Sequence, residues 1–272
     1  MCSYQETPFC YTELMNIKRG IVAFISVAAV ISGVIFISRD RVIAPTKIDS
    51  GNSVEADSEK EASTTDTSSE IKPIIINKRS PLPMDFVTDL VVPDVRLRLD
   101  SGQEQMQIDR ALKADLEAMF SAAQLDGVEL VFGSGYRSRE KQAEFYESYA
   151  ARDGVLAADT YSARPGYSEH QSGLSFDATS ADGTCHLELC WEDTPEGKWM
   201  ASNAPQYGFI IRYPKNKESI TGYQYEPWHF RYVRVANAPN TLDDAERITK
   251  QNLTFEEYYG HPAAPDYSES SN

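Results

Sequence analysis

A polar, acidic stretch in the first third of the chain most limits what it can fold into. From about Pro45 to Glu70 the residues are mostly acids, serines and threonines, with almost nothing to bury. Such a segment cannot recover the entropy cost of ordering through burial, so we expect a disordered acidic stalk over residues 39–71. A folded core must therefore lie in residues 72–260, which are enough for one domain. The remaining 261–272 should be a flexible tail.

An uncharged apolar run, Ile21–Ser38, precedes this stalk. At about 1.5 Å per residue it spans roughly 27 Å, close to the hydrocarbon thickness of a bilayer. A buried core helix would carry a polar stripe, and a cleaved secretory signal would have a shorter apolar run and a small-x-small cleavage pattern. We therefore expect one transmembrane helix at 21–38 and a short cytoplasmic tail at 1–20. The predicted location is the cell membrane, single-pass, with the folded domain extracytoplasmic.

The charge balance excludes one class of partner. There are 41 acidic residues against 26 lysines and arginines, a formal net charge of −15. No surplus of basic side chains exists to neutralise phosphates, so we expect no nucleic acid partner. Hydrophobic residues make up 41% of the chain, which is enough to build a core. The oligomeric state is left open by the sequence.

Hydrophobic periodicity predicts the elements of the folded domain. Apolar residues three and four apart indicate a helix over 108–124, interrupted once by Asp115 and stopped by Gly127. Short strands mixed with unevenly spaced helices do not give the regular rhythm of a parallel sheet. The predicted fold class is therefore α+β, a mainly antiparallel sheet with flanking helices. The other expected elements are helices at 138–152 and 196–207 and strands at 128–133, 174–179, 209–213 and 228–233.

Two of the four histidines stand in sequence contexts that indicate chemistry. His170 lies seven residues before Asp177, and Glu226 lies three before His229. Two imidazoles and one carboxylate are a common ligand set for a catalytic zinc. Glu226 would then be free to act as general base toward a water in the fourth position. By spacing alone, however, two ordinary polar histidines on a loop and a strand are the simpler interpretation.

The surrounding sequence favours the metal site. Five blocks follow one another between residues 133 and 233: SGYRS at 134–138, SARPGYSEHQSGL at 162–174 followed by Asp177, GKW at 197–199, YGFIIRYP at 207–214 and EPWHFRYV at 226–233. Together they closely resemble the VanY-like D-alanyl-D-alanine carboxypeptidases. These are zinc peptidases whose relatives include L,D-carboxypeptidases and VanX dipeptidases.

The resemblance implies a role for each matching residue. His170, Asp177 and His229 correspond to the ligands of one zinc ion, and Glu226 to the catalytic base. Arg137, in the SGYRS block, corresponds to a residue that binds substrate and stabilises the oxyanion.

Two further positions, Gln142 and Ser168, correspond to substrate contacts. A carboxypeptidase must hold a terminal carboxylate, and a guanidinium, an amide and a hydroxyl are suitable donors.

Two cysteines, Cys185 and Cys190, bracket His186 in what looks like a short insertion. We favour a local disulfide, which an oxidising compartment permits. A second metal site that includes His186 is the alternative, although one histidine and two cysteines lack standard finger spacing. Cys2 and Cys10 receive no role.

The sequence thus predicts a membrane-anchored zinc carboxypeptidase that removes the C-terminal D-Ala from peptidoglycan stem peptides. An L,D-carboxypeptidase acting on tetrapeptide stems is the alternative within the same class. From a different class, a non-catalytic wall-binding module could reuse the fold. A missing ligand or a missing Glu226 would favour it, but all four residues are present. A dipeptidase is disfavoured because a long stalk suits a polymeric substrate.

Overall fold

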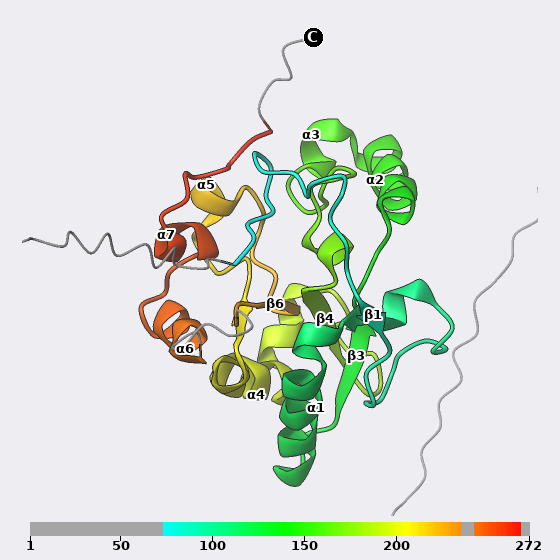
Figure 1. The fold of residues 1–272 in the computed structure, drawn as a ribbon, viewed down its shortest axis with the longest axis vertical. Helices are drawn as coiled ribbons and strands as arrows, with labels where there is room; N and C mark the ends of the chain where they lie inside the picture. Colours follow the sequence, from blue (N-terminus) through cyan, green and yellow to red (C-terminus); the bar gives the residue numbers. More distant parts are fainter. Residues whose placement is uncertain (1–72, 235–241, 268–272) are drawn as a thin grey trace, which may run out of the picture. The chain divides into compact units, whose positions relative to one another are not determined.

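The computed structural model describes residues 73–234 and 242–267. Its centre is a four-stranded antiparallel sheet in the order β3-β4-β6-β5 (Figure 1). These strands are β3 (Leu130–Ser134), β4 (Ser175–Ser180), β6 (His229–Tyr232) and β5 (Phe209–Ile211). A separate antiparallel pair joins β1 (Leu90–Val91) to β2 (Ile108–Asp109). The predicted mixture of helices with an antiparallel sheet is confirmed.

The predicted single-pass location in the cell membrane is contradicted. Within residues 73–234 and 242–267, no helix combines the length and the apolar character needed to cross a bilayer. The longest helix there, α1, has 16 residues, whereas a transmembrane helix needs about 20 apolar ones. The segments predicted as cytoplasmic tail, transmembrane helix and stalk, at 1–20, 21–38 and 39–71, lie outside the described residues.

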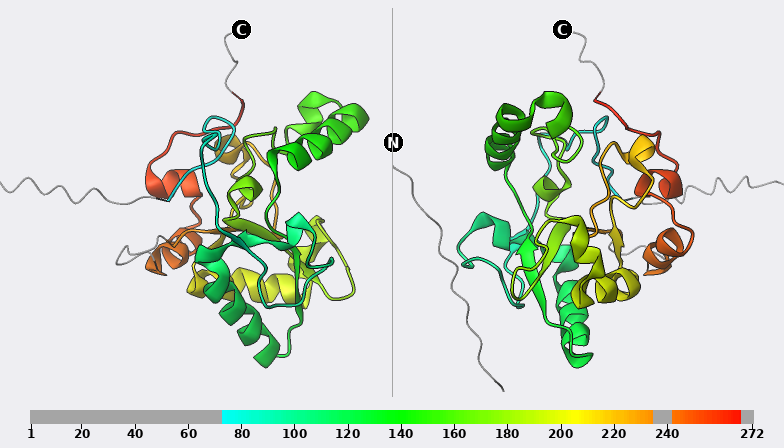
Figure 2. Two further views of the ribbon diagram at one scale, coloured as in Figure 1. Left: turned by 45° about the vertical axis from the view of Figure 1, so that its right-hand side comes forward. Right: turned by 180° about the vertical axis from the view of Figure 1, so that it is seen from behind.

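Helices surround the sheet on several sides. Figures 1 and 2 show α2 and α3 together on one side, and α6 and α7 on another. The helices are α1 (Arg110–Leu125), α2 (Arg139–Asp153), α3 (Val155–Ala158), α4 (Pro195–Asn203), α5 (Glu218–Thr221), α6 (Leu242–Lys250) and α7 (Phe255–Tyr259).

The first helix begins later than the periodicity indicates. Ile108 and Asp109 form β2 instead, and the Asp109 carboxylate accepts a hydrogen bond of 2.8 Å from the backbone N–H of Ala111. An aspartate that caps a helix in this way satisfies a donor that the first turn leaves without a partner. The helix expected at 196–207 likewise divides into α4 and a 3-10 turn at Ala204–Tyr207 that contains Pro205.

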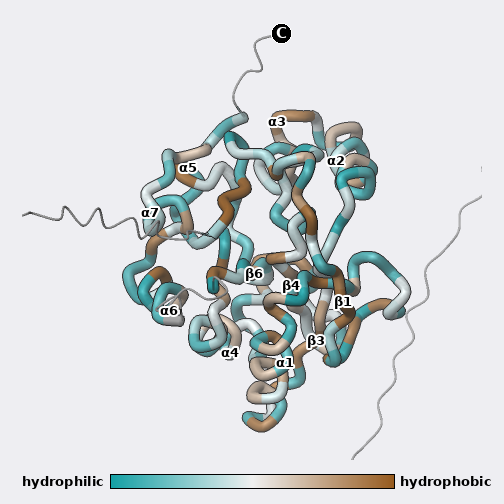
Figure 3. The backbone as a smooth tube through the Cα atoms, viewed as in Figure 1, coloured by the Kyte–Doolittle hydropathy of each residue, from teal (hydrophilic) through white to brown (hydrophobic). Residues whose placement is uncertain are grey.

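Alternation along the strands separates an apolar face of the sheet from a polar face. Phe176 on β4 stacks on Phe132 of β3 and Phe230 of β6, with ring centroids 5.8 and 5.6 Å apart. These rings form one buried cluster with apolar side chains of α1 and α4. Successive side chains of a strand point to opposite faces, so Asp177 and His229 lie on the other face. In Figure 3 brown, hydrophobic segments lie near β1 and β6, and α3 at the outer edge is also brown.

A buried ion pair connects the C-terminal helix to the sheet. Arg212, directly after β5, donates to both carboxylate oxygens of Glu256 on α7, at 2.6 and 3.0 Å. Asn77 donates a third hydrogen bond to the same carboxylate at 3.1 Å. Both charged side chains are fully buried. The block YGFIIRYP, which contains Arg212, is thereby held against α7, a helix outside the five sequence blocks.

The C-terminal residues continue the domain beyond the expected boundary at 260. The backbone N–H of Ala264 donates to the carbonyl of Ile220 at 2.7 Å, and Ala264 is fully buried. Residues 261–267 therefore pack on the domain rather than forming part of the expected flexible tail. Residues 268–272 lie outside the described residues.

We expect Phe176→Ala to lower the free energy of unfolding by about 3–5 kcal/mol, because a fully buried ring leaves a cavity when it is truncated. Denaturant titration of the metal-free protein measures this. Leu125→Ala is the matched control, since Leu125 is 88% exposed and such substitutions usually change stability by under about 0.5 kcal/mol. Equal losses in the two variants would contradict the packing described here.

A second prediction concerns the pH dependence of stability. Burial raises the pKa of Glu256, but the charge of the Arg212 guanidinium and the hydrogen bonds from Arg212 and Asn77 lower it by more. The net pKa therefore lies below the ordinary value of 4.5. A carboxyl whose pKa is depressed by folding stabilises the protein above its unfolded pKa, and this contribution is lost as the pH falls through the folded pKa. The difference in unfolding free energy between wild type and Glu256→Gln should therefore shrink below pH 4.5. Denaturant titrations over a pH series measure it, and a constant difference would contradict the ion pair.

Candidate metal centre and its pocket

Two of the predicted ligands lie directly opposite each other on neighbouring strands. Asp177 of β4 and His229 of β6 are paired in the antiparallel register. The third, His170, comes from a 3-10 turn, Glu169–Ser172, that leads into β4. Gly173 ends this turn with a φ of +71°, and a Cβ there would lie 2.8 Å from the backbone nitrogen of Asp109. Only glycine fits this reversal without strain, and the reversal brings His170 back over the strand.

The three side chains converge on one point. One potential ligand atom from each of His170, Asp177 and His229 lies within 4.8 Å of the others, and all three residues are buried. His170 Nε2 is 3.4 Å from Asp177 Oδ2, and His229 Nδ1 is 3.3 Å from Asp177 Oδ1. Buried donors at this separation could hold a single metal ion. Two imidazoles and one carboxylate fit zinc.

Hydrogen bonds orient two of these side chains. His170 Nδ1 lies 2.6 Å from the carbonyl oxygen of Gly135. A carbonyl only accepts, so Nδ1 carries the proton and Nε2 is left free for a metal. The hydroxyl of Ser134 donates to Asp177 Oδ2 at 2.5 Å. A Cβ at Gly135 would lie 2.3 Å from the carbonyl oxygen of Gln107, so the chain can make this approach only at a glycine.

A further buried residue, the acid Glu226, stands beside the cluster without belonging to it. Its Oε2 is 3.6 Å from His229 Nδ1, and the residue is 7% exposed. Burial, with a smaller contribution from the charge of Asp177, raises the pKa of Glu226 to about 8. A divalent cation at the cluster would favour the ionised carboxylate and lower this pKa. Glu226 is therefore placed to exchange a proton with a water at the site.

The predicted substrate residues occupy one wall of the same site. Arg137 donates to the amide oxygen of Gln142 at 2.9 Å, and its guanidinium lies over the ring of Phe145 at 5.0 Å. The amide nitrogen of Gln142 donates to the carbonyl of Ala163 at 2.6 Å. Both ends of this amide are thus engaged within the protein. Gln142 holds Arg137 in place, and Ser168 lines the same pocket.

All seven predicted site residues border one pocket of about 270 Å³. Aromatic side chains, including Tyr213 and Trp228, form much of its remaining lining. Leu187 contributes from the loop closed by Cys185 and Cys190, whose sulfurs are bonded. The favoured disulfide is confirmed. Because it consumes both thiols, the alternative metal site with His186 does not form; His186 Nδ1 instead lies 3.1 Å from the hydroxyl of Thr179.

Sequence reasoning missed the charged residues behind the site. Arg212 and Arg231 are each buried in an ion pair with Glu169, and the sequence assigned none of the three a role. A signal was present, because Arg212 and Arg231 stand inside apolar strand sequences, FIIRY and HFRYV. A charge in such a position is expensive unless a partner is buried with it.

Comparisons with known proteins agree with this geometry. Residues 105–235 match the VanY family, described as D-alanyl-D-alanine carboxypeptidase. A putative carboxypeptidase of Bacillus subtilis, YodJ, is 40% identical over 186 residues, which are 68% of this chain and 66% of that protein. The chain thus spans slightly less than two thirds of this curated relative's length.

Two solved structures are also similar. The LD-carboxypeptidase LdcB is 40% identical with a TM-score of 0.62, over 69% of this chain and 85% of that one. A vancomycin-resistance D,D-pentapeptidase VanY, in complex with Zn(II), is 33% identical with a TM-score of 0.56, over 68% of this chain and 97% of that one. The chain belongs to the VanY family. A Zn(II) complex within this family and the donor set described above together confirm the predicted zinc cofactor.

We expect His170→Ala to abolish tight zinc binding, because the cluster then offers only two ligands. Elemental analysis of purified, dialysed protein gives the zinc content directly. His186→Ala is the matched control, since this half-buried histidine lies outside the cluster and should leave one zinc per chain. Retention of zinc by the His170 variant would contradict the proposed ligand set.

Proposed function

We propose that this protein is a zinc carboxypeptidase that removes the C-terminal D-alanine from peptidoglycan stem peptides. The observation that carries the proposal is the placement of Glu226. It is a buried carboxylate outside the ligand cluster, 3.6 Å from one ligand and facing the same pocket. A purely structural or binding site for zinc would need no such group. The carboxypeptidases named in the comparisons support the class of reaction.

Each side chain has a defined part in the proposed reaction. Bound zinc supplies a Lewis acid and lowers the pKa of a coordinated water toward about 7. Glu226 accepts the proton of the attacking water on a carboxylate oxygen and returns it to the leaving amine. Arg137 stabilises the negative charge that develops on the carbonyl oxygen, and Gln142 keeps its guanidinium fixed. Because the guanidinium is already oriented, it does not have to move as the charge develops.

The substrate's free carboxylate needs donors at the end of the pocket. Ser168 and Arg137 line it, and Arg137 Nε has no hydrogen-bond partner among the described residues. A buried donor without a partner is costly, so an incoming carboxylate or carbonyl oxygen would satisfy it. This polar end fits a peptide terminus, and the aromatic wall formed by Tyr213 and Trp228 fits the preceding residues.

We assign D,D-specificity because the matched family is described as a D-alanyl-D-alanine carboxypeptidase and because a D,D-pentapeptidase is among the similar structures. The similarity to LdcB, an LD-carboxypeptidase, favours the second candidate, cleavage of tetrapeptide stems. Synthetic penta- and tetrapeptide stems, incubated with the protein with and without a chelator, separate the two. Loss of one alanine from the pentapeptide alone, abolished by chelation, is the expected result. Cleavage of the tetrapeptide alone would overturn the D,D-assignment.

The role of Glu226 has its own test. We expect Glu226→Gln to bind zinc like the wild type and to lose about 100- to 10,000-fold in kcat, because only the proton transfer is removed. Zinc content and hydrolysis are measured on the same preparation. Glu147→Gln, an exposed substitution on α2, is the control and should keep full activity. A Glu226 variant with normal turnover would refute the role, and absence of hydrolysis in the wild type would favour a non-catalytic binding module.

A further inference from the structure

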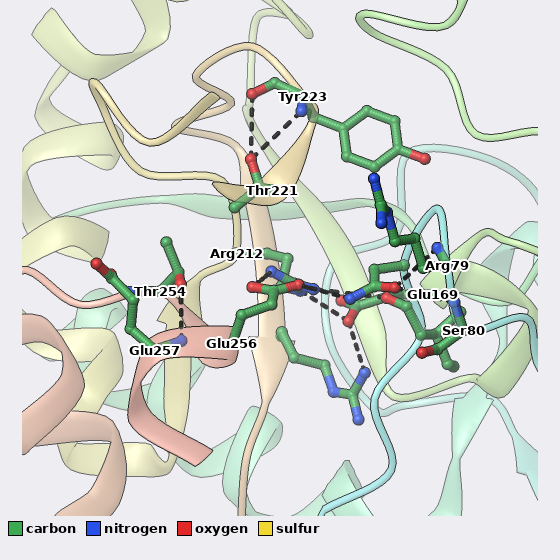
Figure 4. Close-up of polar contacts among 12 residues, drawn as sticks. Arg79, Ser80, Glu169, Arg212, Thr221, Tyr223, Thr254, Glu256 and Glu257 are labelled. Carbon is green, nitrogen blue, oxygen red and sulfur yellow. Dashed lines mark hydrogen bonds and ion pairs between the residues drawn. The ribbon is translucent and has the colours of Figure 1, made fainter. Parts of the chain in front are cut away.

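The carboxylate of Glu169 uses its two oxygens differently. Oε1 accepts hydrogen bonds from Arg212 Nε and Arg231 Nη1, both at 2.8 Å. All three side chains are fully buried. Figure 4 shows Arg212 between Glu169 and Glu256, with contacts to both. The two guanidiniums therefore hold the Glu169 carboxylate in one orientation through a single oxygen.

The other oxygen faces a metal-ligand candidate. Glu169 Oε2 is 3.9 Å from His229 Nε2, and both atoms are buried without a hydrogen-bond partner among the described residues. The opposite ring nitrogen, His229 Nδ1, faces Asp177 at 3.3 Å and Glu226 at 3.6 Å. The imidazole thus directs one nitrogen to the cluster and the other to Glu169. The ring of Tyr213 packs against it, with centroids 5.1 Å apart.

We propose that Glu169 is a positioning residue for the zinc site: its Oε2 accepts the Nε2–H of His229 and so reserves Nδ1 for the metal. This rests on the metal site of the proposed function. Histidines that bind metals usually donate their other ring N–H to a carboxylate or a carbonyl, which fixes the tautomer and raises the basicity of the ligating nitrogen. His170 uses the carbonyl of Gly135 for this purpose, and Glu169 gives His229 the carboxylate form of the same support.

The two arginines also connect Glu169 to other segments of the domain. Glu169 shares Arg212 with Glu256, and Arg231 donates further to the carbonyls of Tyr232 and Ile74, at 2.9 and 2.7 Å. The charged network behind Glu169 thus reaches segments well outside residues 162–177, and Glu169 Oε1 keeps its hydrogen bond from Arg231 when Glu256 is changed.

A simpler role for Glu169 would be to neutralise the two buried arginines. That role needs only Oε1. It predicts that loss of any one charge in the network changes zinc affinity to the same extent. The chain offers a matched pair of variants, Glu169→Gln and Glu256→Gln. Each removes one charge from a carboxylate bound to Arg212, but only Glu169 faces His229.

The experiment measures the zinc dissociation constant of each folded variant by competition with a chromophoric chelator, together with its free energy of unfolding without metal. Both variants should be less stable than the wild type. We expect Glu169→Gln to weaken zinc binding about 10- to 100-fold, the usual effect of removing such a partner, and Glu256→Gln to keep near wild-type affinity. Wild-type affinity in Glu169→Gln, or equal losses in both variants, would overturn the proposal. Because the readout is zinc affinity, it stands apart from whether any stem peptide is hydrolysed.

A second measurement needs no variant and covers the case in which Glu169→Gln does not fold. Histidine side-chain ¹⁵N NMR of the cadmium-113-substituted wild type reports which ring nitrogen binds metal and which carries the proton. We expect metal coupling at His229 Nδ1 and a proton on Nε2 that exchanges slowly with water. Metal coupling at Nε2 would overturn the proposal.

Discussion

The site depends on the register between β4 and β6. That register sets Asp177 opposite His229 on the polar face of the sheet, while Phe176 and Phe230 stack on the apolar face. Slipping either strand by one residue would turn every one of its side chains to the opposite face, which would expose the rings and bury the ligands in the core. The hydrophobic packing of one face therefore specifies the metal geometry of the other. Folding of the core therefore also assembles the metal site.

Charged residues on the polar face are tolerated because they are buried in matched pairs. Glu169, Glu256, Arg212 and Arg231 neutralise one another, and all four side chains are fully buried. Burying these charges costs desolvation free energy that can offset their attraction, so the network need not stabilise the fold. Removing one member, however, leaves an uncompensated buried charge and typically costs about 3–5 kcal/mol. Its value here is geometric. It fixes the turn that carries His170 and connects that turn to α7.

The sequence was most informative where short-range pattern and family motifs coincided. The antiparallel sheet followed from strand-like segments without a parallel rhythm, and the seven predicted site residues all border one pocket. Long-range partners could not be predicted, because nothing local indicates them. Asp115 looked like an interruption of an apolar helix face, yet its carboxylate accepts the hydroxyl of Tyr232 at 2.5 Å, 117 residues away. Glu169 stood inside a recognised motif, but its partners Arg212 and Arg231 come from two other strand segments.

The central claim is that His170, Asp177 and His229 share one zinc ion. Anomalous diffraction at the zinc absorption edge, from a crystal of the purified protein, tests it most directly. The account predicts a single strong peak about 2.0–2.2 Å from His170 Nε2, His229 Nδ1 and an Asp177 carboxylate oxygen, the usual zinc distances to such ligands. A peak elsewhere, or zinc bound through His229 Nε2, would contradict it.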